Sequence, residues 1–432
     1  MRPLLPSGFG LGGHLQTSLQ GLRSISNPLC NIPGLQAGEP AEFMLRAIIL
    51  SMQSVGHTIP NPAVGCLLTR PDGTLVAAGA TEVYGGRHAE RVAFDALMAM
   101  HQSSQGLDAY VTLEPCSHHG RQPPCCELFS DSKIENLYVA VLDPNPLVNG
   151  KGLKFVQNEA RKVQVGVAQN AATAWHLPFL VQQKLGRPLI AGKWAQTLDG
   201  ALADANGTSQ WITGPAARAH GHWLRLKYDV TAVGLNTLLA DQPSLTARDC
   251  WRPNMRQPNV LILDLVSESA ADDTRLQSGL RKVSDSSNDR KIGLVCPQSH
   301  VATLQGKLPP EIQLLGLPSH SRELSLAKQL NSFWTGPEIN QWLGRAPQSI
   351  FIEGGAQLLS HLVAADLLDV LHIFLAPMIL GGQARRVNAT QLSSPELSMA
   401  SHFDIISMFP LGNDMLLELA PARIVNAFFA QG

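Results

Sequence analysis

Two short motifs place one histidine, one carboxylate and two cysteines where they could hold and use a metal ion. His88 and Glu90 are separated by one residue, and Cys116 is separated from Cys125 by eight. One imidazole and two thiolates fill three tetrahedral positions on Zn²⁺ and leave the fourth for water, whose pKa the metal lowers to about 7. Glu90 is then free to carry a proton from that water to a leaving amine. The pattern predicts a zinc site for hydrolytic deamination.

The spacing of these motifs leaves the ligand set partly open. The signature H-x-E with P-C-x-x-C is typical of zinc-dependent base deaminases, but eight residues separate the cysteines here instead of two. Cys126 therefore competes with Cys125 for one ligand position. His118 and His119 are further candidates, although adjacent side chains rarely point the same way. We expect these two histidines to contact substrate or solvent.

The elements that must position these residues alternate between helix and strand. Apolar residues from Phe43 to Met52 recur at helical spacing, and a second amphipathic helix begins at His88. The turn Pro71-Asp72-Gly73-Thr74 separates two apolar runs and predicts a β-hairpin. Strands are predicted at 64–68, 75–80, 109–114 and 137–142. This alternation is typical of an α/β fold with helices covering a sheet.

An unusual lysine opens the second half of the chain. Lys193 lies inside the apolar run 189–195, which predicts a strand. An isolated lysine in such a strand needs a charged partner, because lysine is almost never fully buried unless paired. Asp199 and Glu353 are the candidate partners.

Turn and composition signals organise the rest of this half. Gly186-Arg187-Pro188 predicts a domain boundary, and a helix is predicted from an N-cap at Thr213, with Pro215 near its start, to about Lys227. The residues 267–290 are rich in Ser, Asp and Arg and predict an exposed inserted loop. Strands are predicted at 230–234, 259–266, 349–353, 370–376 and 415–419.

A pair of glycines follows the predicted strand 349–353. Gly354 and Gly355 precede a helix predicted over 358–365. Such a turn can cradle an anion, because glycine permits close backbone approach and the first N–H groups of a helix are unpaired. Many α/β turns carry two glycines for packing alone, so this pattern by itself is a weak indication of a binding site.

Composition limits the possible functions. The chain has 432 residues, enough for two or three domains, and its hydrophobic and charged shares of 44% and 16% are those of a globular protein. A formal net charge of −1 argues against broad nucleic-acid binding. No stretch approaches the roughly 20 apolar residues of a membrane span. Seven cysteines are too few for a disulfide scaffold, which predicts a reducing compartment such as the cytoplasm.

The first residues differ from the rest. Residues 1–38 contain no acidic residue and are expected to form a disordered extension. They include Gly8 to Gly13, which match G-x-G-x-x-G. We do not interpret this match as a dinucleotide site, because no strand pattern precedes it and no helical pattern follows.

The metal-ligand motifs resemble a known family. His88-Ala89-Glu90 with the Pro-Cys-Ser-His-His-Gly-Arg-x-Pro-Pro-Cys run ending at Cys125 is similar, over residues 42–150, to the deaminase half of the bifunctional riboflavin-biosynthesis deaminase/reductases. The resemblance implies that His88, Cys116 and Cys125 bind Zn²⁺ and that Glu90 shuttles the proton. It also implies that Asn61 of Asn-Pro-x-Val-Gly contacts the pyrimidine. His118 and Arg121 are expected to hold the ribose phosphate.

One position departs from this family. The family commonly has a histidine seven positions before the ligand histidine, where this chain has Thr81. A substrate contact is therefore expected to be weaker or replaced, but no metal ligand is lost.

Motifs of the second half resemble the reductase half of the same family. They are Lys-x3-Thr-Leu-Asp-Gly, Ser-Gln-Trp-Ile-Thr, Asp-x-Pro-x-Leu-Thr and Ile-Glu-Gly-Gly, and they extend the resemblance to roughly residues 42–420. It implies a dihydrofolate-reductase-like fold that uses NADPH, with Lys193 and Asp199 near the reacting ribosyl carbon. Gln196 departs from the usual small residue beside the cofactor. The implied cofactor residues are Ala195, Trp211, Thr237, Asp241 and Gly355. The implied substrate residues are Ser209, Arg225, Leu245, Arg248 and Glu353.

Together these features predict an α/β protein with two catalytic domains. We expect an N-terminal extension over 1–40, a cytidine-deaminase-like three-layer domain over 41–186, and a dihydrofolate-reductase-like α/β domain over 187–432. The resemblance implies a small-molecule substrate, a pyrimidine ribosylamine phosphate that is first deaminated and then reduced by NADPH. It also implies a homodimer through the reductase half, with no nucleic-acid or membrane partner.

Two rival hypotheses remain at this point. A nucleic-acid deaminase would share the zinc chemistry, but the near-neutral charge, the long insert between the cysteines and the second domain count against it. A chain with one inactive half would keep only one activity. The complete set of deaminase motif residues argues against an inactive first half, whereas the motifs of the second half are looser.

Overall fold

The computed structural model describes residues 38–430 except 120–121, 146–147, 158–161, 249–255, 266–272, 287–288, 318–325, 355, 387–395, 397 and 399. Residues 1–37 of the predicted extension, Arg121 and Gly355 lie outside these residues, and Pro40 at the end of the predicted extension already begins a helix. The described chain divides into two units: one comprises the residues up to Leu185 with 428–430, and the other runs from Gly186 to Ala427. Within this part of the chain, no helix has the length and apolar character needed to cross a membrane.

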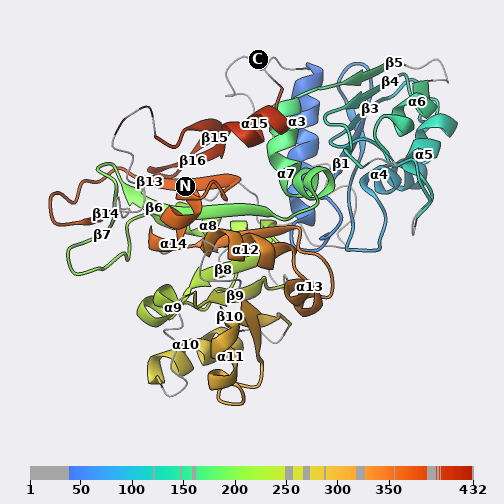
Figure 1. Cartoon of the computed structure of the whole chain (residues 1–432). Coiled ribbons are helices and arrows are strands. Elements are labelled where there is room, and N and C mark those ends of the chain that lie inside the picture. Colours follow the sequence, from blue (N-terminus) through green and yellow to red (C-terminus); the bar gives the residue numbers. More distant parts are fainter. Residues whose placement is uncertain are drawn as a thin grey trace. The chain divides into compact units, whose positions relative to one another are not determined.

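The first unit is built on a five-stranded sheet (Figure 1). In spatial order its strands are β2 (Leu75–Ala80), β1 (Gly65–Thr69), β3 (Asp108–Val111), β4 (Asn136–Val139) and β5 (Lys162–Val165). β1 is antiparallel to β2 and β3, and the remaining pairs are parallel, which confirms the predicted hairpin. The helical segments are α3 (Pro40–Ser51), η1 (Met52–Ser54), α4 (Ala89–Ala99), α5 (Cys125–Asp131), α6 (Lys151–Gln157) and α7 (Gln169–Leu185).

Two glycines allow helices to pack closely on both faces of this sheet. A Cβ atom on Gly65 of β1 would lie 2.0 Å from the Ala47 carbonyl oxygen in α3, and one on Gly79 of β2 would lie 2.2 Å from the Ala89 oxygen in α4. Gly79 pairs with Cys66, the neighbour of Gly65, so the two glycines face opposite sides. Helices α3 and α4 therefore cover opposite faces, which gives the expected three-layer arrangement.

The second unit contains a nine-stranded sheet that is parallel except at one edge. In spatial order its strands are β11 (Ile312–Leu317), β10 (Ile292–Pro297), β9 (Asn259–Leu263), β8 (Val230–Gly234), β12 (Ser349–Glu353), β6 (Leu189–Thr197), β13 (Val370–Ala376), β16 (Asp414–Pro421) and β15 (Phe403–Leu411). β16 runs antiparallel to both neighbours. The short strands β7 (Ala201–Ala203) and β14 (Arg385–Arg386) pair separately.

Helices cover both faces of this second sheet. They are α8 (Pro215–Lys227), α9 (Leu235–Asp241), α10 (Thr274–Asp285), α11 (Gln298–Leu304), α12 (Leu326–Thr335), α13 (Pro337–Leu343), α14 (Ala356–Ala364) and α15 (Ala422–Phe428). Ile262 of β9 belongs to the same buried cluster as Leu280 of α10, while its neighbour Leu261 belongs to a second cluster with Leu359 of α14. Adjacent residues of one strand thus enter different cores, as expected of a parallel strand buried on both faces.

The prediction of an exposed loop over 267–290 is wrong. The described part of this segment contains helix α10, whose Leu276, Leu280 and Val283 are fully buried. These residues are spaced at i, i+4 and i+7, so they form one apolar stripe on a helix that is otherwise polar. The prediction used the average composition of the segment, which is polar, and not the spacing of its few apolar residues.

The predicted helix cap at Thr213 is also wrong. The N-cap of α8 is Gly214, Pro215 is at the first helical position, and no side chain caps the helix. The predicted end at Lys227 is confirmed. Our sequence reasoning did not predict the elements β10, α11, β11, α12, α13 and β15, although it placed the other strands of the large sheet correctly to within a few residues.

Candidate active sites

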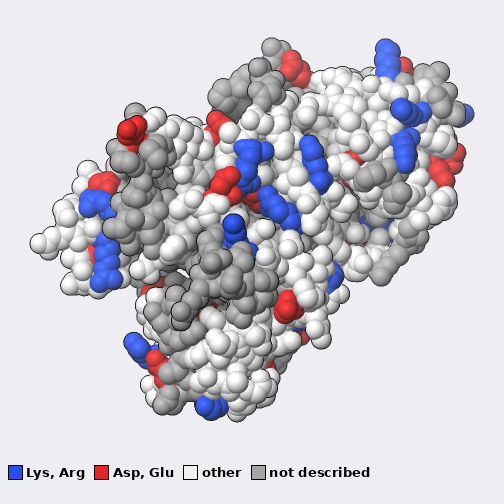
Figure 2. Space-filling view, in the orientation of Figure 1, with Lys and Arg blue, Asp and Glu red and all other residues white. Residues whose placement is uncertain are grey.

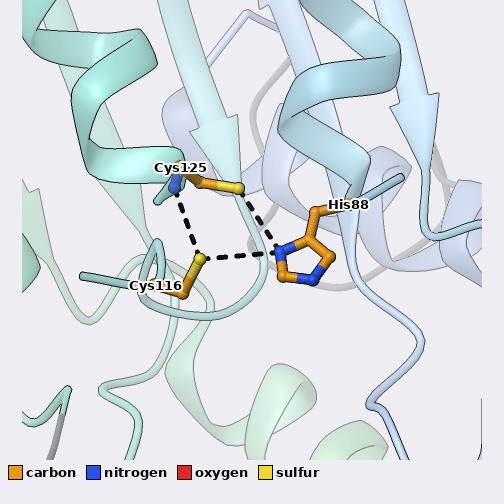
Figure 3. A group of neighbouring side chains, drawn as sticks. All are labelled: His88, Cys116 and Cys125. Atoms are coloured by element: carbon orange, nitrogen blue, oxygen red, sulfur yellow. Dashed lines mark hydrogen bonds between the residues drawn. The ribbon is translucent and has the colours of Figure 1, made fainter. Parts of the chain in front are cut away.

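Three donor atoms meet in the first unit at the ends of its elements. His88 is the N-cap residue of α4, Cys125 is the first residue of α5, and Cys116 lies in the loop after β3. His88 Nδ1 lies 3.6 Å from Cys116 Sγ and 3.4 Å from Cys125 Sγ (Figure 3). All three donor atoms lie within 4.8 Å of one another. The structure thus brings together the three residues that the sequence motifs single out.

The distances between these donors fit a tetrahedral zinc ion. Ligand bonds of about 2.0–2.1 Å to nitrogen and 2.3 Å to sulfur, at tetrahedral angles, separate the nitrogen from each sulfur by about 3.5 Å. The observed nitrogen–sulfur distances lie on either side of that value. The donor set, one imidazole and two thiols, is also the one expected of a catalytic zinc site with an open fourth position.

The surroundings of Cys116 favour its thiolate form. Hydrogen bonds from Cys125 and His88 lower the pKa of Cys116 to about 4, and the Cys125 backbone N–H donates to its sulfur at 3.3 Å. The hydrogen bond between Cys116 and His88 raises the pKa of His88. The hydrogen bond between Cys116 and Cys125, together with burial, raises the pKa of Cys125. A thiolate is the form of cysteine that binds metals.

Glu90 lies in the first turn of α4, directly beside the three donors. Its side chain is buried, and this burial, together with the Cys116 thiolate, raises the pKa of its carboxyl to about 7. A carboxyl with a pKa near the working pH can both accept and release a proton. The carboxyl therefore has the properties that a proton carrier needs.

The alternative ligands lie apart from this group. Cys126 is buried, its backbone N–H donates to the Cys116 carbonyl oxygen at 3.1 Å, and burial raises the pKa of its thiol to about 11. His118 is exposed, and His119 Nε2 lies 3.8 Å from the Glu127 carboxylate. Among the described residues, only His88, Cys116 and Cys125 form a possible metal-binding group.

Two further residues that the sequence motifs single out lie in the first unit. Asn61 is half-buried in the loop between η1 and β1, and the Trp175 indole anchors this loop by donating to the Ala63 carbonyl oxygen at 2.9 Å. Thr81, the residue that departs from the family pattern, is buried and accepts a hydrogen bond from Val64 N–H through its hydroxyl. The Thr81 side chain thus contacts the backbone of Val64, the residue before β1.

The second unit holds a charged cluster on the sheet face covered by α8. Lys193 on β6 pairs in register with Glu353 on β12, and Arg225 of α8 forms an ion pair with Glu353. Burial lowers the pKa of Lys193, an effect that Glu353 opposes and Arg225 reinforces. Glu353 is therefore the charged partner of Lys193, and the other candidate, Asp199, pairs with Arg386.

Asp199 receives hydrogen bonds from several groups of one distant segment. Its carboxylate accepts from the Gly381 N–H at 3.0 Å, the Leu380 N–H at 3.3 Å and Arg386 Nη2 at 2.9 Å. The Thr197 hydroxyl donates a fourth bond at 2.5 Å, which most strongly lowers the pKa of Asp199. Asp199 thus fixes the segment 380–386 beside the end of β6.

The loop after α9 carries two of the predicted substrate residues. Arg248 is exposed, and its guanidinium donates to the Ser244 hydroxyl at 2.9 Å. The Leu245 side chain is buried in the core, so only the Leu245 backbone is available to a ligand. Arg225 Nη1 donates to the Thr246 carbonyl oxygen at 2.7 Å and so connects this loop to the charged cluster.

Sequence reasoning missed one histidine of this cluster. His222 Nδ1 lies 2.9 Å from the Thr246 carbonyl oxygen and 3.1 Å from Arg225 Nη1. Burial and the nearby Arg225 charge lower the pKa of His222 to about 4, so its ring is neutral at neutral pH. The available signal was its position three residues before Arg225, which places both on one helix face.

The predicted cofactor residues lie around the carboxyl ends of the parallel strands. Ala195 is half-buried on β6, Thr237 and Asp241 lie on α9, and the Thr237 Cγ2 atom is 3.3 Å from where a Cβ on Gly354 would be. Gly354 has a positive φ of 67°, which suits glycine. Ligands of open α/β sheets bind at this edge. The small residues at this edge let a ligand come close to the backbone.

Trp211 and Ser209 lie in the segment before α8. The Trp211 side chain is 63% exposed, and the Arg218 guanidinium lies over its ring at 4.5 Å from the centroid. Ser209 is half-buried and its carbonyl oxygen accepts a hydrogen bond from the Ile212 N–H. An exposed indole of this kind offers a flat surface for a ring of a ligand.

Family comparisons match both halves of the chain. Residues 39–141 match the cytidine and deoxycytidylate deaminase zinc-binding region, and residues 188–317 and 339–417 match the RibD C-terminal domain. The chain is 30% identical over 378 residues to the riboflavin biosynthesis protein RibD of Actinobacillus pleuropneumoniae, covering 87% of this chain and 94% of that protein. It is 32% identical to RibD of Escherichia coli K12, covering 88% and 99%.

Solved structures show the same similarity. The Thermotoga maritima diaminohydroxyphosphoribosylaminopyrimidine deaminase/5-amino-6-(5-phosphoribosylamino)uracil reductase aligns with a TM-score of 0.70 and 28% identity, covering 89% of this chain and 99% of that one. Acinetobacter baumannii RibD aligns with a TM-score of 0.67 and 29% identity over the same shares of the two chains. Both similarities extend over the deaminase and the reductase halves.

Proposed function

This chain belongs to the RibD family of bifunctional riboflavin-biosynthesis enzymes, and from that premise we propose which reactions its two units perform. The first unit hydrolyses the 2-amino group of 2,5-diamino-6-ribosylamino-4(3H)-pyrimidinone 5′-phosphate and releases ammonia. The second unit reduces the ribosyl group with NADPH and gives 5-amino-6-ribitylamino-uracil 5′-phosphate. We assign residues 41–186 to the deaminase, 187–432 to the reductase, apart from 428–430, which lie with the first unit, and 1–40 to an extension.

For the deaminase we propose that His88, Cys116 and Cys125 hold Zn²⁺. Bound zinc supplies the Lewis acidity that makes water a nucleophile at neutral pH. Glu90, buried beside the donors, takes the proton from the nucleophile and delivers it to the departing amine. Asn61 orients the pyrimidine, and His118 and Arg121 bind the ribose phosphate.

For the reductase we propose that NADPH lies along Ala195, Trp211, Thr237, Asp241 and the turn at Gly355. NADPH supplies the hydride that reduces C1′ of the ribosyl group, and one proton completes the reduction. Lys193 supplies this proton, because burial lowers the pKa of its ammonium group and so makes it a stronger acid, and because its cluster also contains the proposed substrate residues Arg225 and Glu353. Asp199 contributes by fixing the segment 380–386 next to the reacting carbon.

The substrate of the reductase is held by its phosphate in this proposal. Arg225 and Arg248 provide the donors for the 5′-phosphate, and Ser209, Leu245 and Glu353 complete the pocket. The single observation that carries the whole assignment is the meeting of His88, Cys116 and Cys125 beside Glu90, in a chain that also matches the reductase domain.

The substrate class, location and assembly follow from the same premise. We propose a small-molecule pyrimidine phosphate as substrate, in preference to single-stranded nucleic acid, and a homodimer through the reductase unit. A cytoplasmic location is supported by the free thiols of Cys66, Cys116, Cys125, Cys126 and Cys296.

A chromatographic product assay tests this proposal. The purified chain is incubated with the diaminopyrimidinone ribosylamine phosphate, with and without NADPH. We expect deamination in both samples and the ribityl product only with NADPH. Deamination without any NADPH consumption would contradict the reductase assignment. The absence of deamination from a chain with bound zinc, together with activity on single-stranded DNA or RNA, would contradict the deaminase assignment.

A further inference from the structure

The loop that carries Leu245 and Arg248 adopts an unfavourable backbone conformation. Leu245 has a φ of 52°, in the left-handed region that leucine rarely adopts. Such a conformation persists only when neighbouring groups hold it in place. The groups that hold this loop therefore determine where the Leu245 backbone and the Arg248 side chain meet a ligand.

A buried arginine holds this loop from the core side. Arg290 is 7% exposed and precedes β10. Its Nη1 donates to the Leu245 carbonyl oxygen at 2.9 Å, and its Nη2 donates to the Ser244 carbonyl oxygen at 2.7 Å and to the Val283 oxygen of α10. The guanidinium thus binds the two consecutive carbonyl groups that flank the Leu245 Cα atom and connects them to α10.

Arg290 carries a charge that no carboxylate of the described residues balances. The described residues include no ion-pair partner for it, and its acceptors are backbone oxygens. Burial and the charge of Arg225 lower the pKa of Arg290 to about 10, so it remains a cation at neutral pH. Arg225 is itself paired with Glu353. The positive charge of Arg290 therefore remains available to attract an anion bound at the loop.

From these contacts we infer that Arg290 is a positioning residue of the proposed reductase site, which fixes the segment 244–248 so that Leu245 N–H and Arg248 bind the substrate phosphate. The inference rests on the proposed function of the second unit and adds to it a residue outside the motifs. Arg290 itself lies behind the loop and acts through it.

Replacing Arg290 tests this role. In Arg290→Met we expect the KM of the reductase for the pyrimidine phosphate to rise about tenfold, as for the loss of one charged hydrogen bond, with kcat and the KM for NADPH changed less than about twofold. Inhibition by inorganic phosphate should weaken by a similar factor. Arg290→Lys should restore part of the affinity, because it keeps the charge but can satisfy fewer of the carbonyls. Arg281→Met, on the exposed side of α10, is the matched control.

The outcomes separate this inference from the proposed function. No NADPH-dependent reduction by the unmodified chain would overturn both. Reduction by the unmodified chain with an unchanged KM and phosphate inhibition in Arg290→Met would overturn only the role of Arg290. If Arg290→Met fails to fold, Arg290→Lys decides: a folded variant with the KM of the unmodified chain contradicts the inference, and a raised KM at unchanged kcat supports it.

Discussion

Arg225 and Glu353 form a two-armed ion pair that joins α8 to the carboxyl end of β12. Arg225 Nη2 donates to Glu353 Oε2 at 2.9 Å, and Arg225 Nε donates to Oε1. Glu353 also pairs in register with Lys193 on the neighbouring strand. One carboxylate therefore balances two cations in a largely buried cluster, and its removal should change the protonation of Lys193.

We expect Glu353→Gln to shift the pH dependence of reduction. Glu353 raises the pKa of Lys193 against the effect of burial, so the neutral amide lets that pKa fall further. A lysine that donates a proton works only while protonated, so the rate falls as pH rises through its pKa. In the variant this fall should begin at a lower pH, with kcat near neutral pH reduced about ten- to hundredfold. Stopped-flow NADPH oxidation across pH measures this.

The deaminase of the same variant serves as its control. Because Glu353 belongs to the second unit, deamination by Glu353→Gln should match that of the unmodified chain. A reductase pH profile that keeps its shape and position in the variant would show that Glu353 does not set the protonation of Lys193.

We expect Glu90→Gln to separate metal binding from catalysis. The amide is nearly isosteric with the carboxyl and is not a ligand, so the variant should keep zinc at the level of the unmodified chain. It cannot carry a proton, so deamination should fall about 10²- to 10⁴-fold. Metal content by atomic emission and ammonia release measure the two properties. Deamination at the rate of the unmodified chain would show that Glu90 does not carry the proton.

The two adjacent cysteines should respond differently to substitution. Cys125 Sγ lies 3.4 Å from His88 Nδ1, whereas Cys126 lies outside the donor group. Cys125→Ser should therefore lose most of its zinc, and Cys126→Ser, the matched control, should retain it. The number of zinc ions bound per chain after dialysis, measured for both variants, shows which cysteine is the ligand. The reverse result would make Cys126 the ligand.

Asp199→Asn should lower the rate of reduction without moving its pH profile. The amide keeps one acceptor oxygen, which can still accept from the Thr197 hydroxyl, but it loses the acceptor for the Gly381 N–H and the charge that binds Arg386. Because Asp199 holds a segment and does not exchange the proton in our proposal, kcat should fall while the pH limits stay in place. A pH limit that disappears in the variant would instead make Asp199 a proton donor or acceptor.

Helix α10 should respond to substitution as a core element. Leu276 is fully buried, so Leu276→Ala is expected to lower the free energy of unfolding of the second unit by about 2–5 kcal/mol. Arg281→Ala, on the exposed face of the same helix, should change it by less than about 0.5 kcal/mol. Urea denaturation followed by residual reductase activity measures both. If both variants changed the free energy of unfolding by equally small amounts, the segment would not be a core helix and the prediction of a loop would stand.

The metal group could be predicted from sequence because its chemistry depends on side-chain types within short motifs. His88, Cys116 and Cys125 are brought together by the starts of two helices and one strand end, of which the hydrophobic pattern predicted the helix at His88 and the strand before Cys116. The same reasoning could not choose between Cys125 and Cys126. That choice depends on the direction of each side chain from the first turn of α5, which adjacency in the sequence does not reveal.

The reductase cluster was harder to predict because much of it is made of backbone and distant residues. The Thr246 carbonyl oxygen contacts both His222 and Arg225. Every residue has a backbone carbonyl group, so residue types cannot indicate which one takes part in a site. Asp199 meets Arg386 across 187 positions, so no local pattern relates them. The polar composition around α10 suggested a loop, and only the stripe from Leu276 to Val283 contradicts that interpretation.

The end of the described chain has a consequence for the order in which the protein is made. Residues 428–430 belong to the first unit, and the Ala430 N–H donates to the Asn170 side chain of α7 at 3.1 Å. Every residue of the second unit is synthesised before Ala430. The deaminase unit therefore cannot complete its contacts while the ribosome is still translating the reductase, so the unit whose synthesis begins first is not the first that can finish folding.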